Sequence, residues 1–172
     1  MLKGQNVVLT EVRPGDQETL YRWINDAETV SWNAPYAPVP WKNHTAWFDG
    51  LGMNPSRIFF VVRESVDGPA IGTIQLIDIH RVHRTSELTI RIGSEEHRGR
   101  GIGTEALALV VKFAFDDLNL QRVWLRVFLT NHRAIKAYEK AGFEMEGAMR
   151  RAAFIQGRWV DEAIMAVLRQ AP

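Results

Sequence analysis

The sequence predicts an α/β domain built around a mixed β-sheet, and three observations support this class. Three β-type runs follow one another over residues 57–92, two helical segments enclose a further strand over 102–142, and β-type sequence closes the chain to 168. Strands and helices in this order pack as layers around one sheet. The 172 residues, of which 46% are hydrophobic, suffice for one core, so we expect a single domain over 1–172.

The chain opens with a strand and a helix. Residues 6–12, NVVLTEV, form a β-type run that ends at the pair Pro14-Gly15. Asp16 follows in a position suited to cap a helix, which we expect to extend to about residue 26. One face of this helix carries the large apolar side chains Leu20, Trp23 and Ile24.

A proline-rich segment separates this helix from the next one. Residues 30–40, VSWNAPYAPVP, hold three prolines, which exclude regular structure there. Trp32 and Tyr36 are large side chains to leave in a loop, so we expect this loop to cover another part of the protein. A second helix is expected over 41–51. We interpret the tryptophans at 23, 32, 41 and 47 as core and cover, with a cation-π cage for an ammonium group as the alternative.

The central part of the chain predicts three neighbouring strands. Residues 57–64 and 70–79 flank Asp67-Gly68-Pro69, a turn signal between β-rich runs, and therefore predict a hairpin. Residues 86–92, SELTIRI, alternate polar and apolar side chains and predict the third strand.

The second half of the chain alternates helices and strands. The helix that begins near residue 102 shows the spacing of a buried stripe, formed by Leu107, Val110, Val111, Ala114 and Leu118. A strand over 122–129 follows, and then a helix from Asn131 that ends at Gly142, a residue suited to the left-handed position after a helix. Residues 143–168 are β-type, with a turn near Gly157.

A turn with three glycines, Gly99, Gly101 and Gly103, lies between the third strand and the long helix. Glycine permits positive φ and lets a ligand approach the bare backbone, and the first N–H groups of the following helix have no internal partner. The helix dipole, together with Arg98 and Arg100, adds positive charge at the same place. The turn therefore predicts a site for a phosphate or a pyrophosphate.

Of three known phosphate-binding patterns, this turn fits one. A Walker loop requires Lys followed by Ser or Thr after its last glycine, but Thr104 and Glu105 stand there. A dinucleotide fingerprint requires the spacing G-x-G-x-x-G, which these evenly spaced glycines do not provide. The pattern Arg-x-x-Gly-x-Gly is met by Arg98, Gly101 and Gly103.

With this pattern the chain resembles the GNAT acetyltransferases, whose loop for the acetyl-CoA pyrophosphate carries Gln/Arg-x-x-Gly-x-Gly/Ala between a strand and a helix. Residues 131–147 resemble the second signature of the family, in which an asparagine opens a helix and a tyrosine precedes a closing Gly-Phe. Residues 83–93 and 146–168 resemble the RimJ/RimL and spermidine acetyltransferase branch. The resemblance covers about 58–168 and implies the GNAT fold, with a mostly antiparallel central sheet flanked by helices.

The resemblance implies acetyl-CoA as the co-substrate and a role for each matching residue. The backbone N–H groups of the turn would hold the pyrophosphate, namely those of Arg98, Gly99, Arg100, Gly101, Ile102, Gly103 and Thr104. The pantetheine arm would pair with backbone groups of Arg91, Ile92 and Gly93, at a strand edge splayed from its neighbour. Asn131 would contact the arm from the opposite strand, and Tyr138 would stand near the thioester sulfur as the general acid.

Glu87 is the candidate general base, acting through a water molecule. Each of these residues can instead have a purely structural role. Glu87 can be the polar face of a strand, Tyr138 a core side chain, and Arg98 and Arg100 solvated surface charges. Asn131 is a helix cap whether or not it also contacts the co-substrate.

The activity that the resemblance implies is transfer of an acetyl group from acetyl-CoA to a primary amine by direct attack. Residues 1–57 would shape the acceptor side, and 58–168 would form the acetyl-CoA-binding core. A polyamine or another small cationic amine is favoured, with Asp26, Glu28 and Asp49 supplying negative charge. The alternatives are a protein N-terminal amine of the ribosomal-protein type, an amino sugar, and a non-catalytic module that binds acyl-CoA.

Composition and short motifs limit the partners, cofactors and cellular location that we expect for this chain. The net charge of +1 does not indicate a nucleic-acid partner, and the chain has no cysteine for a disulfide or a thiol nucleophile. We expect no metal, since His80 and His83 would lie on opposite faces of an extended segment without a third ligand. No signal peptide or membrane span is recognised, so we expect a cytoplasmic protein with no membrane partner. The resemblance also implies that copies of the chain can form a homo-oligomer.

Overall fold

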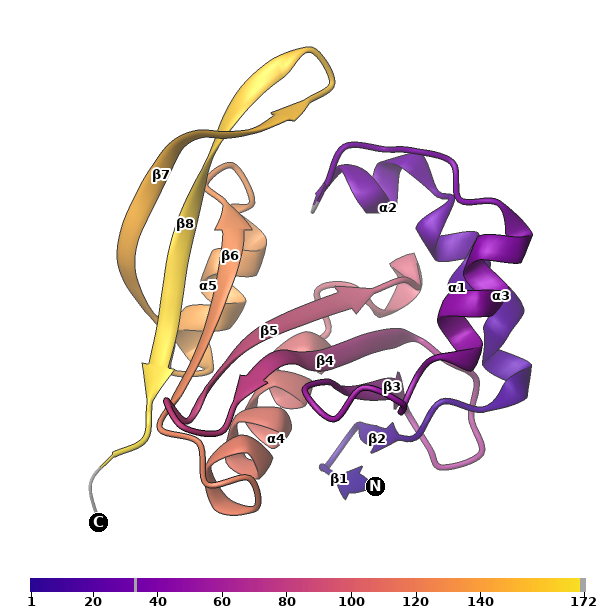
Figure 1. The fold of residues 1–172 in the computed structure, drawn as a ribbon, viewed down its shortest axis with the longest axis horizontal. Coiled ribbons are helices and arrows are strands. Elements are labelled where there is room, and N and C mark those ends of the chain that lie inside the picture. Colours follow the sequence, from indigo (N-terminus) through magenta and orange to yellow (C-terminus); the bar gives the residue numbers. More distant parts are fainter. Residues whose placement is uncertain (33, 171–172) are drawn as a thin grey trace.

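A computed structural model describes residues 1–32 and 34–170, which fold around one eight-stranded sheet in the order β1-β2-β3-β4-β5-β6-β8-β7 (Figure 1). In this part of the chain, β5 and β6 pair in parallel and all other neighbouring strands pair antiparallel. The predicted mixed, mostly antiparallel sheet is therefore confirmed. The strands are β1 Leu2–Lys3, β2 Val8–Thr10, β3 Ile58–Arg63, β4 Gly72–His80, β5 Thr85–Ile92, β6 Arg122–Phe128, β7 Glu144–Ile155 and β8 Arg158–Leu168.

Helices flank the sheet. They are α1 Gln17–Ile24, α2 Ala27–Ser31, α3 Trp41–Asp49, α4 Ile102–Asp116 and α5 His132–Lys140, with short 3₁₀ turns at Pro14–Asp16 and Glu95–His97. Among the described residues, no helix is long and apolar enough to span a membrane.

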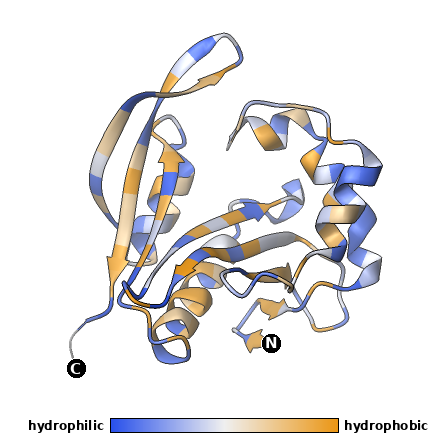
Figure 2. Ribbon diagram, in the orientation of Figure 1, coloured by the Kyte–Doolittle hydropathy of each residue, from blue (hydrophilic) through white to orange (hydrophobic). Residues whose placement is uncertain are grey.

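Strand alternation separates two faces of the sheet. Along β5, hydrophobic and hydrophilic residues alternate (Figure 2). Leu88, Ile90 and Ile92 pack in the core with α4. Glu87, Thr89 and Arg91 lie on the opposite face. Helices α1 and α3 approach that second face, where the ring of Trp47 lies 5.8 Å from that of Phe59 on β3. The second face is therefore covered at one side while its centre remains polar.

The two halves of the sheet separate beyond a short parallel contact. Strands β5 and β6 pair only from Thr85 to Glu87, opposite Arg122 to Trp124. Both strands continue beyond this contact and diverge (Figure 1). This is the splayed strand edge that the resemblance implies.

Most of the predicted elements are present. The hairpin of β3 and β4 is confirmed by antiparallel pairing that joins Phe59 to Gln75. Gly142 after α5 and Gly157 between β7 and β8 adopt positive φ values of 89° and 80°. Residues 34–40 form neither helix nor strand, as their prolines predict, and Asn33 of the same loop lies outside the described residues.

Two local predictions were wrong. The short helix α2 was missed because five residues are too few to show helical periodicity. Asp16 does not cap α1 with its side chain, because its carboxylate accepts hydrogen bonds from the Arg13 N–H and from the buried guanidinium of Arg63. Asp26 is the carboxylate that caps a helix here, since it accepts from the Thr29 N–H at 2.7 Å at the start of α2.

Candidate active site

The glycine turn, residues 98–104, presents bare backbone at the start of α4. Gly99 and Gly101 adopt φ values of 79° and 81°, and among the described residues beyond the adjacent ones no heavy atom lies within 4 Å of the place where a Cβ would stand on either glycine. Among the described residues, the N–H groups of residues 99–104 donate no hydrogen bond. An open nest of N–H groups at the positive end of a 15-residue helix suits a bound phosphate.

The two arginines of the turn differ in what they contact. Arg98 is largely buried, and its guanidinium donates to the carbonyl of Ile92 at 3.2 Å and to Thr29 Oγ1 at 3.2 Å. The N–H of Arg98 donates to the Glu95 carbonyl. Arg98 therefore holds the turn against the end of β5 and α2, and its N–H is not directed at a ligand. Arg100 is 58% exposed, with its guanidinium 3.4 Å from a carboxylate oxygen of Glu64.

A cavity of about 370 Å³, the turn cavity, lies between the glycine turn and α5. It brings together most of the residues expected to bind the co-substrate: Arg91, Ile92, Arg98, Gly99, Gly101, Gly103, Thr104, Asn131 and Tyr138. Gly93, Arg100 and Ile102 are not part of its lining, and Ile102 is buried in the core.

Three cations that the sequence analysis did not single out also line the turn cavity. They are Arg133, Lys136 and Lys140, which lie on one face of α5. Their i, i+3, i+7 spacing is the signal that could have found them. They place positive charge across the cavity from the glycine turn.

The backbone groups of β5 that face away from β4 are those of Ile90 and Ile92, and the Ile92 carbonyl already accepts from Arg98 Nε at 3.2 Å. Gly93 donates its N–H to the Ile71 carbonyl of the neighbouring chain segment at 3.1 Å. Antiparallel pairs alternate between hydrogen-bonded and non-bonded, so the backbone of Arg91 also faces β4, while Ile90 and Ile92 face the splayed edge. The N–H of Gly93, which was expected to pair with the pantetheine arm through its backbone groups, is therefore already used, and Ile90, which the sequence analysis did not name, faces the splayed edge.

Gly93 has a packing role instead. A Cβ on Gly93 would lie 2.1 Å from the indole of Trp23, so this glycine lets α1 approach the end of β5.

Tyr138 lines the turn cavity from α5. Its side chain is buried, and burial raises the pKa of its phenol to about 12 because the ionised form loses hydration. Among the described residues, no hydrogen bond to its hydroxyl is found. Asn131 lines the same cavity and caps α5, with its side-chain oxygen accepting from the Ala134 N–H at 3.2 Å.

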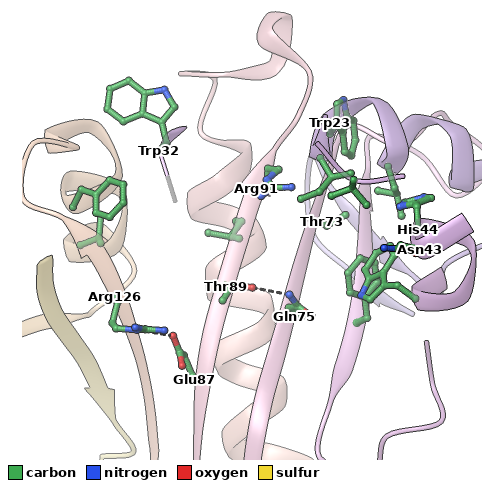
Figure 3. A pocket seen from close by; sticks show the side chains of 18 of the residues that line it. Trp23, Trp32, Asn43, His44, Thr73, Gln75, Glu87, Thr89, Arg91 and Arg126 are labelled. Carbon is green, nitrogen blue, oxygen red and sulfur yellow. Dashed lines mark hydrogen bonds and ion pairs between the residues drawn. The ribbon is translucent and has the colours of Figure 1, made fainter. Parts of the chain in front are cut away.

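A second cavity of about 530 Å³, the sheet cavity, lies over the polar face of β4 and β5 (Figure 3). Its floor consists of Thr73 and Gln75 on β4 with Glu87, Thr89 and Arg91 on β5. The walls come mainly from α1, α3, the loop before α3, β6 and β8. Polar side chains on an interior sheet face, where core residues would otherwise stand, indicate a binding surface.

The carboxylates of the sheet cavity are shared by one arginine. Glu87 is 7% exposed and accepts a hydrogen bond from Arg126 Nε at 3.2 Å (Figure 3). A second nitrogen of Arg126 lies 3.9 Å from Glu162. Asp26, Glu28 and Asp49, which were expected to supply negative charge here, do not line the cavity.

Three of the four grouped tryptophans reach the sheet cavity. Trp23, Trp32 and Trp47 line it, while Trp41 packs edge-on against Tyr21 at 4.8 Å outside the lining. The four therefore do not form one cage.

The two cavities adjoin at three shared residues, Trp32, Ile90 and Arg91. Tyr138 lies on the side of the turn cavity, and Glu87 lies on the side of the sheet cavity. A ligand on the glycine turn can therefore extend along the splayed edge of β5 until it meets a second ligand over the floor.

The imidazoles of His80 and His83 do not lie on opposite faces, as was expected. Their rings stack 4.1 Å apart in the turn after β4, and the His83 N–H donates to His80 Nδ1. In the part of the chain that the structure describes, no cluster of three side chains suited to a metal is found.

Comparison with known proteins agrees with this architecture. A family model for the acetyltransferase (GNAT) domain matches residues 6–144. The chain is 36% identical to the spermidine N(1)-acetyltransferase of Escherichia coli (strain K12) over 103 residues, which are 60% of this chain and 55% of that protein. It is 29% identical to the L-amino acid N-acetyltransferase AaaT of the same strain over 163 residues, covering 93% of this chain and 96% of that protein.

A solved structure shares the fold. The spermidine N-acetyltransferase from Vibrio cholerae in complex with CoA and spermine superposes with a TM-score of 0.84 at 28% identity, covering 95% of each chain. The match to the E. coli spermidine enzyme spans just over half of that relative's length. Because the family model covers most of the chain, including the glycine turn, the splayed edge and α5, the chain belongs to the acetyltransferase (GNAT) domain family.

Proposed function

We propose that this chain transfers the acetyl group of acetyl-CoA to a primary amine by direct attack. The observation that carries the proposal is the junction of the two cavities at Trp32, Ile90 and Arg91. One cavity offers an anion site at a helix start, and the other offers a polar floor for a small molecule. A donor and an acceptor bound in these cavities would meet with no covalent enzyme intermediate.

The turn cavity suits the co-substrate. The N–H groups of residues 99–104 would hold the pyrophosphate, and Arg133, Lys136 and Lys140 would attract the phosphates from α5. The backbone groups of Ile90 and the N–H of Ile92 would pair with the amides of the pantetheine arm, much as an added strand would. Asn131 would contact the arm from the other side while it caps α5.

The chemistry requires groups for one oxyanion and two proton transfers. A backbone N–H at the splayed edge would donate to the carbonyl oxygen as the amine adds. Tyr138 would protonate the departing sulfur, and its raised pKa of about 12 keeps the phenol protonated at neutral pH. Glu87, whose carboxylate Arg126 orients, would remove the amine proton through a water molecule.

The proposal also concerns the chemical class of the amine that accepts the acetyl group. The names of the relatives support a polyamine, and the aromatic side chains Trp23, Trp32 and Trp47 could contact its ammonium groups. A protein N-terminal amine and an amino sugar are the alternatives within the same reaction. A non-catalytic module that binds acyl-CoA is the alternative outside it.

The test is CoA release from acetyl-CoA by the purified chain. The acceptors would be spermidine, spermine, amino acids, short peptides with free N-termini and amino sugars, with Tyr138→Phe assayed alongside. Turnover that the substitution reduces supports the proposal, and the preferred acceptor assigns the class. Tight acetyl-CoA binding without turnover on any amine would replace the proposal with the non-catalytic module.

Two further expectations belong with this function. We infer a cytoplasmic location, which fractionation of cells that express the tagged chain would check. Self-association is likewise a prediction, to be checked by sedimentation of the purified chain at several concentrations.

A further inference from the structure

Arg91 is a cation on the floor of the sheet cavity, and no carboxylate of the described residues pairs with it. Its side chain projects from the polar face of β5, in line with Thr89 and Glu87 (Figure 3). Among the described residues, Arg91 forms no ion pair, and its Nε is buried without a hydrogen-bond partner. Burial lowers the pKa of its guanidinium, although an arginine stays protonated in proteins.

Two other arginines near this face, Arg63 and the half-exposed Arg126, have carboxylate partners. Arg63 donates to Asp16, Thr10 and the Gly68 carbonyl, so its charge is paired and its donors are used. Arg126 lies between the carboxylates of Glu87 and Glu162. Arg91 is thus the cation of the sheet cavity left without a carboxylate in this part of the chain.

A second unsatisfied polar atom lies beside Arg91. Gln75 donates its amide to Thr89 Oγ1 at 2.9 Å, which leaves its Oε1 buried without a partner. Gln75 pairs with Thr89 across β4 and β5 and is therefore the diagonal neighbour of Arg91, at about 7 to 8 Å between backbones. One small molecule can reach both side chains.

A buried N–H of a charged group without an acceptor is costly, and so is a buried acceptor without a donor. Both costs disappear when a ligand supplies an anionic oxygen to Arg91 and an N–H to Gln75. A guanidinium presents a planar fork of donors that matches a carboxylate. The floor is therefore complementary to a molecule that carries a carboxylate as well as an amine.

We infer that the acceptor of this chain is a primary amine that also bears a carboxylate, as an amino acid does, and that Arg91 binds the carboxylate. The inference rests on the proposed acetyl transfer and names its acceptor class. The carboxylates and guanidiniums that line the sheet cavity, those of Glu87, Glu162, Arg91 and Arg126, sum to no net formal charge. A polyamine has no oxygen to offer Arg91 and would bring further positive charge to it.

Matched acceptors that differ only in one carboxylate test the inference. Lysine and cadaverine form one pair, and ornithine and putrescine form another. We expect kcat/KM for the carboxylate member of a pair to exceed that for the diamine by at least about tenfold, because a site built around a charged hydrogen bond rejects an analogue that lacks it. Arg91→Met keeps an unbranched side chain, removes the guanidinium, and should abolish this preference.

Arg57→Met is the matched control. The Nε of Arg57 is also buried without a partner, but Arg57 lines neither cavity. Its substitution should leave the ratio between lysine and cadaverine unchanged. A diamine preference in the unmodified chain, or a ratio that Arg91→Met does not alter, would overturn the inference while leaving the proposed acetyl transfer intact.

Calorimetric titration separates this inference from the reaction itself. Lysine and cadaverine would be titrated into the CoA-saturated chain, in which no acetyl group is present to transfer. Tighter binding of lysine that is lost in Arg91→Met supports the role of Arg91 even if turnover is absent. Equal or weaker binding of lysine overturns it, whereas failure of acetyl-CoA to bind overturns the proposed function alone.

Discussion

Tyr138 combines deep burial with a position on the wall of the turn cavity. A phenol with a pKa of about 12 is a weak acid, so it protonates a leaving thiolate only where the same burial makes that thiolate more basic. We therefore expect Tyr138→Phe to lower kcat by about 10²-fold, the lower end for acid-base assistance, with little change in the KM for acetyl-CoA. Initial rates of CoA release measure both constants.

Tyr21→Phe serves as the control for this substitution, because Tyr21 packs on Trp41 and lines neither cavity. An unchanged kcat in Tyr138→Phe would mean that Tyr138 is a core side chain and no more.

The raised pKa of Tyr138 also makes folding stability depend on alkaline pH. Its folded pKa lies above the ordinary value of 10.0, so the neutral phenol contributes stability that is complete below about pH 10 and is lost as pH rises toward 12. The loss amounts to about 2 to 3 kcal/mol for a shift of this size. In denaturant unfolding, the unmodified chain should lose stability relative to Tyr138→Phe over this range, and a constant difference between them would contradict the prediction.

Gly101 can be tested against a glycine of the same geometry. Gly101 and Gly157 have φ values of 81° and 80°, and neither has an atom within 4 Å of the Cβ position. Substitution by alanine should therefore destabilise the fold similarly at both positions, by about 1 to 2 kcal/mol. Only Gly101→Ala should also weaken acetyl-CoA binding in calorimetry, because its Cβ enters the space beside the open N–H groups; equal affinities in the two variants would refute the phosphate role of the turn.

At the scale of elements, the start of α1 is tied to β3 by a buried ion pair. The Arg63 guanidinium lies 2.6 Å from the Asp16 carboxylate, with side chains 3% and 7% exposed. Removing one partner of such a pair leaves a buried charge uncompensated, so Asp16→Asn should lower the free energy of unfolding by about 3 to 5 kcal/mol. Denaturant titration measures this loss.

The surface pair of Arg13 and Asp67 provides the comparison. It spans 3.8 Å, and the Asp67 side chain is 97% exposed. Asp67→Asn should cost less than about 1 kcal/mol, as exposed pairs do. Similar losses for the two aspartates would mean that burial does not govern the strength of these pairs.

Strand β5 contributes side chains both to the hydrophobic core and to the sheet cavity. In β5, the alternation places Ile90 and Ile92 in the core and Thr89 and Arg91 in the sheet cavity. The alternation was visible in the sequence, and it predicted the strand. It did not reveal that the polar face lies beneath α1 and α3, because that depends on how Trp23 packs against Gly93, 70 positions apart in the chain.

At the scale of the whole molecule, adjoining cavities imply a ternary complex. Acetyl-CoA and the amine would occupy the turn cavity and the sheet cavity together, and no cysteine is present to carry the acetyl group. Initial rates measured over both substrate concentrations should therefore give intersecting double-reciprocal lines. Parallel lines, the signature of a covalent intermediate, would contradict direct transfer.

Much of the fold was predictable because its signals are local. The stripe of α4, the hairpin of β3 and β4, and the glycines after α5 and between β7 and β8 each depend on neighbouring residues. Asp16 was misassigned because its partner Arg63 is distant in sequence, and a carboxylate before a helix has the same local appearance whether it caps the helix or binds an arginine.

The sequence by itself determined the α/β class, the family and the turn that suits a phosphate, because periodicity and glycine spacing are properties of short segments. Only the tertiary structure decided which other charged side chains line the sheet cavity with Glu87, which the sequence had already suggested. The splay of β5 from β6 and the packing of α1 and α3 bring Arg91 and Arg126 there and leave out Asp26, Glu28 and Asp49. Electrostatic partners act through space, so the order of residues along the chain does not specify them.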